Sequence, residues 1–76
     1  MNMEQFLKDF AACFEETDIS EFAPATIFKE LDEWDSLTTL AIIGMCHMKY
    51  NVSVTGSEIR DVTTIEDLYQ LVLSKK

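Results

Sequence analysis

Residues 32–40, DEWDSLTTL, mark the point where a polar loop turns into a long apolar run. Asp35 and Ser36 are residue types that favour helix N-termini, because their side-chain oxygens accept hydrogen bonds from free backbone N–H groups. The same junction can also hold the Ser36 hydroxyl in solvent, within reach of another molecule. The stretch therefore has two interpretations: a simple helix cap, or a cap beside a serine to which something is attached.

The run that follows predicts a helix from Asp35 or Ser36 to about Tyr50, with Asn51 as its stop. A helix that is apolar on nearly all sides is either central to a fold or presents a face to something else. In a chain of 76 residues the other helices cannot surround it fully, so we expect exposed apolar surface for a partner or an acyl ligand. The alternative is that those helices cover most of it. Its apolar residues are Leu37, Leu40, Ala41, Ile42, Ile43, Gly44, Met45, Cys46 and Met48.

Three other segments carry helical patterns. The first stripe, capped by Asn2 with Gln5 reaching back, ends near Glu16 and consists of Met3, Phe6, Leu7, Phe10, Ala11 and Phe14. Residues 17–35 are expected to form a long, packed connection with a short helical turn near residues 26–30. Residues 52–54 are expected to be loop, and Thr55 with Glu58 predicts a capping box opening a short helix to about Asp61. The last stripe is expected to be capped by Thr63 with Glu66 reaching back, and consists of Ile65, Leu68, Tyr69 and Val72.

The predicted fold is all-α, a bundle of three longer helices and one short helix with a long first loop, in one domain over residues 1–76. The formal net charge of -8 disfavours nucleic acid and anionic membranes as partners, and no apolar run reaches membrane-spanning length. No signal peptide is visible. We therefore expect a cytoplasmic monomer without membrane insertion. Trp34, just before the cap, is expected to pack against the core.

The sequence offers little support for catalysis or metal binding. Cys13 and Cys46 match no metal or redox spacing and are expected to be reduced thiols. His47 follows Cys46 directly, and adjacent residues on a helix point about 100° apart, so they rarely bind one ion. No nucleophile is paired with a base, so we expect neither a metal site nor an enzyme.

At Asp35-Ser36-Leu37 the chain resembles the acyl carrier proteins, the family of phosphopantetheine-binding carrier domains. The resemblance covers nearly all of residues 3–73. It includes the Asp-Ser-Leu motif at the start of the second helix, an aromatic residue near its end, here Tyr50, and the Thr-Thr pair before the last helix, here Thr63 and Thr64.

The resemblance implies a four-helix carrier fold in which Ser36 receives 4'-phosphopantetheine from coenzyme A through a phosphopantetheinyl transferase (holo-synthase). Acyl groups would then travel as thioesters on the arm, between acyl ligases, synthases or other acyl-transferring enzymes. Asp35 is expected either to cap the helix or to contribute to recognition by the transferase. Leu37, the third residue of the motif, is expected to belong to the same attachment site. Family members shelter the acyl chain between their helices, and Met45, Cys46 and Met48 are candidates for that role here.

One feature departs from the carriers of fatty-acid synthesis, which usually bear several acids along the second helix. Between Ser36 and Ser57 this chain has no Asp or Glu, although it contains 14 acidic residues. We therefore expect partners to dock on Leu37, Leu40 and Ala41, and we favour a specialised carrier over a general carrier of fatty-acid synthesis. The pathways considered are fatty-acid-like, polyketide or other specialised biosynthesis. The alternatives are a peptidyl or aminoacyl carrier, or a helical protein-interaction domain without a prosthetic group.

Overall fold

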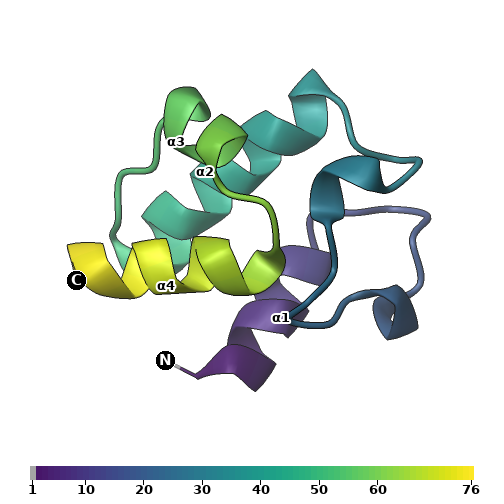
Figure 1. Ribbon diagram of the computed structural model, residues 1–76, viewed down its shortest axis with the longest axis horizontal. Helices are drawn as coiled ribbons and strands as arrows, with labels where there is room; N and C mark the ends of the chain where they lie inside the picture. The colour runs from purple at the N-terminus through teal and green to yellow at the C-terminus, as the bar shows by residue number, and fades with distance from the viewer. Residues whose placement is uncertain (1) are drawn as a thin grey trace.

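The computed structural model describes residues 2–76, which form four α-helices and, within that range, no β-strand. The helices are α1 (Met3–Ala11), α2 (Ser36–Tyr50), α3 (Gly56–Asp61) and α4 (Ile65–Lys75) (Figure 1). Helix α1 packs against α2 and α4, and α3 packs against α2. The predicted all-α class, with three longer helices and one short one, is confirmed.

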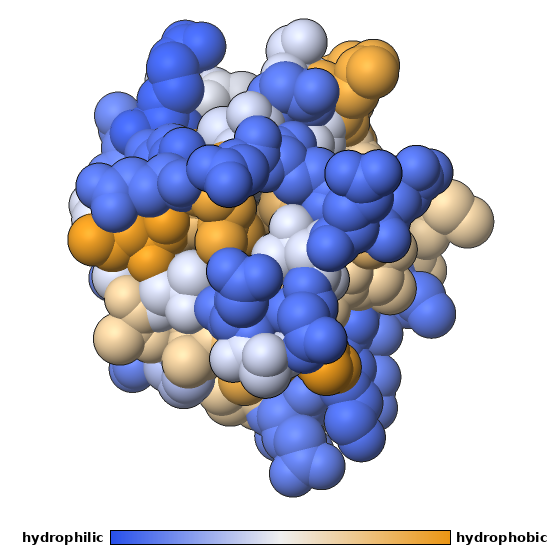
Figure 2. All heavy atoms as spheres, turned by 90° about the vertical axis from the view of Figure 1, so that its right-hand side faces the viewer, coloured by the Kyte–Doolittle hydropathy of each residue, from blue (hydrophilic) through white to orange (hydrophobic). Residues whose placement is uncertain are grey.

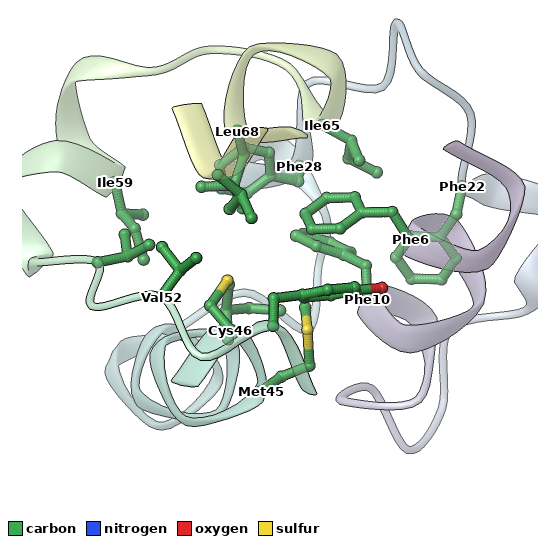
Figure 3. Close-up of a cluster of buried hydrophobic side chains, with 14 of the residues drawn as sticks. Phe6, Phe10, Phe22, Phe28, Met45, Cys46, Val52, Ile59, Ile65 and Leu68 are labelled. Atoms are coloured by element: carbon green, nitrogen blue, oxygen red, sulfur yellow. The ribbon is translucent and has the colours of Figure 1, made fainter. Parts of the chain in front are cut away.

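One hydrophobic core joins all four helices and the loops between them. Its side chains come from α1, the first connection, α2, the segment after α2, α3 and α4 (Figure 3). Phe6, Phe10 and Phe28 have no exposed surface, and the rings of Phe10 and Phe28 meet edge to face at 5.4 Å between centroids. Residues 52–54 form a loop rather than a strand, as predicted, and packing fixes this loop because Val52 and Val54 are buried.

The first helix ends at Ala11, earlier than the apolar pattern predicts. Phe14 is still buried, but the N–H groups of Cys13 and Phe14 already bond three residues back, to Phe10 and Ala11. The next three N–H groups, of Glu15, Glu16 and Thr17, all donate to the Glu33 carboxylate at 2.7–3.0 Å. The Thr17 hydroxyl donates to it at 2.8 Å. The helix stops because a carboxylate from the far end of the connection binds these amides.

Glu33 is thus expected to stabilise the fold in a pH-dependent way. The hydrogen bonds, first that from the Glu15 N–H, hold the pKa of this carboxyl below its usual value of 4.5. A group with a lowered folded-state pKa contributes fully above its unfolded pKa, and the contribution is lost as the pH falls through the folded one. We predict that Glu33→Gln lowers the melting temperature by on the order of 5 °C at neutral pH. Thermal unfolding between neutral pH and pH 3 would show this difference shrinking below about pH 4.5, whereas a constant difference, or an equal effect of the exposed Glu16→Gln, would contradict it.

The long first connection contains two short 3₁₀ turns, Ile19–Glu21 and Phe28–Glu30. The second lies where a helical turn was predicted. Seen from the side of this connection, the surface is mostly hydrophilic with small hydrophobic patches (Figure 2). The carbonyls of Pro24 and Thr26 accept the N–H groups of Glu66 and Ile65 at 2.9 and 3.1 Å. The connection is therefore attached to the first turn of α4 as well as to the end of α1.

The start of α4 corrects the predicted cap by one residue. Thr64, not Thr63, is the N-cap, and its hydroxyl accepts the Asp67 N–H at 3.1 Å. The returning carboxylate is that of Asp67, not Glu66, and it accepts the N–H groups of both Thr63 and Thr64 at 3.1 Å. Because two threonines and two acids stand side by side, the pattern alone does not fix which pair forms the box. At α1, likewise, Gln5 does not reach back to the cap, since its amide donates to Asp9.

The other helix ends follow local chemistry. Thr55 and Glu58 form the predicted capping box of α3. Asn51 adopts the left-handed conformation after α2, with φ of 56°, and the N–H of Val52 reaches back to the Cys46 carbonyl at 3.2 Å. Such a left-handed residue lets the chain turn away from the helix axis. Within residues 2–76, no helix is both long and apolar enough to cross a membrane.

Candidate functional site

The junction at the start of α2 is built around the Asp35 carboxylate. Asp35 is the N-cap, and its Oδ1 accepts the Thr38 N–H at 2.9 Å. The Thr38 hydroxyl, buried beneath it, lies 2.9 Å from the same Oδ1 and 2.9 Å from the Glu33 carbonyl oxygen. These bonds, first that from the Thr38 N–H, hold the pKa of Asp35 below its usual value, so the cap is an ionised carboxylate at neutral pH.

Ser36 is the first residue of α2 and is exposed. Because Asp35 serves as the cap, the Ser36 side chain is not required for that purpose. The two interpretations of the junction are thus compatible in this structure. Asp35 closes the helix end, and the neighbouring Ser36 is exposed, so another molecule can reach it.

Trp34 anchors the approach to this serine. Its ring meets Phe28 edge to face at 5.0 Å and stacks near Phe14 at 6.4 Å between centroids. Trp34 is half-buried, so it packs against the core as predicted. With Glu33 bonded to the amides after α1, two consecutive side chains fix the loop before Asp35 and Ser36.

A groove of about 500 Å³ opens beside Ser36, between α2 and α3. Ser36, Thr39, Leu40 and Ile43 recur at helical spacing and form one wall, and α3 forms the other. Most of the lining is carbon, so the groove suits an apolar chain that starts at Ser36. The lining residues are Lys29, Trp34, Ser36, Thr39, Leu40, Ile43, Gly56, Ile59 and Arg60.

Helix α2 buries one apolar side in the core and exposes another to solvent. This is the exposed apolar surface that the sequence predicts for this helix. Ile42 and Cys46 lie in the core, whereas Leu37 and Leu40 are 73% and 63% exposed. Ala41, next to them, is also exposed. The three residues expected to contact partners therefore lie on accessible surface close to Ser36.

The soft side chains near the end of α2 are separated from the Ser36 groove. Met45 and Cys46 are buried in the core, and Met48 is 84% exposed, so none of the three lines it. Burial raises the pKa of the Cys46 thiol to about 11, which makes it inert at neutral pH. His47 is exposed, and residues 2–76 bring no three potential metal ligands together.

Several groove residues escaped the sequence analysis. The residues of the α2 wall could have been grouped from the sequence, because Ser36, Leu40 and Ile43 follow one another at intervals of three or four residues, which places them on one face of a helix. Lys29, Ile59 and Arg60 have none, because they come from the first connection and from α3 and meet only in the fold. Lys29 is held there by hydrogen bonds to the carbonyls of Ile59 and Arg60, at 3.1 and 2.8 Å.

Comparison with known proteins gave no match in any of three searches, whether against family models, curated proteins or solved structures.

Proposed function

We propose that this protein is an acyl carrier that holds its cargo on a 4'-phosphopantetheine arm attached to Ser36. The observation that carries the proposal is the exposed Ser36 hydroxyl at the start of α2, beside a cap that does not use it and at the rim of a mostly apolar groove. The Asp35-Ser36-Leu37 motif, on which the resemblance to acyl carrier proteins rests, and an all-helical fold with four helices support the proposal.

Attachment requires a phosphopantetheinyl transferase. The Ser36 oxygen would form a bond to the phosphorus that carries pantetheine in coenzyme A, the adenosine bisphosphate portion would leave, and the transferase would take the hydroxyl proton. The arm supplies a terminal thiol, which holds acyl groups as thioesters. The protein itself catalyses no step in this scheme and acts in the cytoplasm as a shuttle between acyl ligases, synthases or other acyl-transferring enzymes.

The groove between α2 and α3 supports a sheltering role for apolar cargo. It begins at Ser36 and is lined by Leu40, Ile43 and Ile59, so a chain bent back from the arm would meet carbon surface. These residues replace Met45, Cys46 and Met48 as the candidates for contact with the cargo.

The experiment that tests the proposal is the intact mass of the protein after incubation with coenzyme A and a broad-specificity transferase. A gain of one phosphopantetheine supports a carrier. No gain with several transferases, in reactions that modify an established carrier protein, would overturn the proposal and favour a helical interaction domain.

Docking of partners is proposed to rest on apolar contact rather than on acidic side chains. Leu37 and Met48 are both highly exposed on α2, but Leu37 follows Ser36 and Met48 lies three turns away. We predict that Leu37→Ala lowers the transferase's kcat/KM about tenfold, the effect of losing a contact of about 1.4 kcal/mol. Met48→Ala, the matched control, should change it less than about twofold.

The salt dependence of the same reaction separates apolar from ionic docking. Charge pairs across an interface are screened by salt, whereas apolar contacts are not. Raising the salt from about 50 to about 500 mM is therefore expected to change kcat/KM less than about threefold. A steep loss with salt would contradict docking through Leu37, Leu40 and Ala41.

A further inference from the structure

The hollows of the surface differ in the charges that line them. One hollow near the end of α1 is bordered by the acids Glu16, Glu21, Asp32 and Glu33, and a second by Glu15, Glu33 and Asp35. Among the residues that the structure describes, those lining the groove at Ser36 include no acid and two cations, Lys29 and Arg60. In a chain with 14 acids and 6 bases, a hollow whose lining holds two cations and no acid differs from the two acidic hollows.

The two cations differ in whether they already have a hydrogen-bonding partner. The Lys29 ammonium donates to two carbonyls in the last turn of α3, those of Ile59 and Arg60, so its position is fixed while its charge remains. Arg60 is exposed, and the ion pairs within residues 2–76 are Lys8 with Glu4 and Lys75 with Glu58, so its guanidinium is free for another anion. A guanidinium presents a planar set of donors that fits phosphate and carboxylate oxygens.

We propose that the Ser36 groove binds an anionic group carried by the attached arm, with Arg60 as its direct partner and Lys29 as a fixed second charge. This inference rests on the proposed function, because the arm brings the anion. Two sources share the chemistry: the phosphodiester next to Ser36, and a carboxylate on the acyl group. The phosphodiester stands close to Asp35, so a cation on the opposite wall offsets a repulsion that would otherwise destabilise the modified state.

The test compares three loaded forms, made with coenzyme A, butyryl-coenzyme A and succinyl-coenzyme A, each first verified by intact mass. The free arm carries only the phosphodiester, butyryl adds an uncharged chain, and succinyl adds a carboxylate to a chain of equal carbon number. The readouts are the Arg60 side-chain N–H resonance and the melting temperature relative to the unmodified protein. Arg60→Gln is paired with Lys49→Gln, which removes the same charge from an exposed site outside the groove.

If the phosphodiester is the anion, the Arg60 resonance shifts in all three forms. If the carboxylate is the anion, the Arg60 resonance shifts in the succinyl form only. In either case we expect Arg60→Gln to remove roughly 2–5 °C of the stabilisation that loading brings, and Lys49→Gln to leave it intact. The inference is overturned if all three forms load but none shifts the Arg60 resonance, or if both variants behave alike. Failure to load at all would instead contradict the proposed function.

Discussion

Ser36→Ala is expected to eliminate modification by coenzyme A and a transferase, to below detection by intact mass. The reason is chemical, since alanine has no oxygen to form the phosphodiester. The substitution should leave the fold unchanged, because Asp35 rather than Ser36 caps α2 and because Ser36 is exposed. The far-ultraviolet circular dichroism of the variant is therefore expected to match that of the parent protein.

The matched control is Ser57→Ala. Ser57 is also exposed and lies in the first turn of a helix, but it is on α3 and has no motif around it. It should be modified at the rate of the parent protein. Residual modification of Ser36→Ala, or loss of modification in Ser57→Ala, would show that the arm is attached elsewhere.

Phe28→Ala is expected to cost about 3–5 kcal/mol of unfolding free energy. Phe28 has no exposed surface and its ring contacts both Phe10 and Trp34, at 5.4 and 5.0 Å between centroids. A domain of this length has a total stability of roughly 4–11 kcal/mol, so the loss is a large part of it. Because Trp34 rests on this ring, the loop before Ser36 is expected to loosen as well.

Chemical denaturation followed by circular dichroism measures this loss. Ile27→Ala provides the comparison, since Ile27 is the neighbouring residue and is 42% exposed. It should cost less than about 1 kcal/mol. Equal losses for the two variants would mean that the Phe28 ring does not occupy the centre of the core.

Features that depend on neighbouring residues could be predicted from the sequence. The helix stop at Asn51 and the Thr55–Glu58 box follow from local hydrogen-bonding chemistry, which also placed the start of α2 at Asp35 or Ser36 without choosing between them. Where local chemistry offered two equivalent choices, as at Thr63 and Thr64, tertiary contacts decided. The N–H groups of Ile65 and Glu66 are taken by carbonyls of the first connection, which no local pattern reveals.

Features that depend on distant residues could not be predicted. The Glu33 carboxylate accepts the backbone N–H groups of residues 15–17, and no residue next to Glu33 in the sequence indicates that it would have this role. Arg60 and Lys29 are 31 residues apart and share a groove only because Lys29 is bonded to the end of α3. The helix start at Asp35 and Ser36 was therefore predictable, whereas the groove beside it and the charged residues of that groove required the fold.

The most direct test of the central claim uses the protein isolated from cells that produce it naturally, because a transferase in vitro can modify a serine that is never modified in those cells. Cleavage after basic residues gives a peptide of residues 30–49 that contains Ser36 as its one serine. Fragmentation mass spectrometry of this peptide is predicted to find phosphopantetheine on Ser36, with or without an acyl group. Recovery of the peptide only in its unmodified form, from cells whose other carrier proteins are modified, would contradict the account.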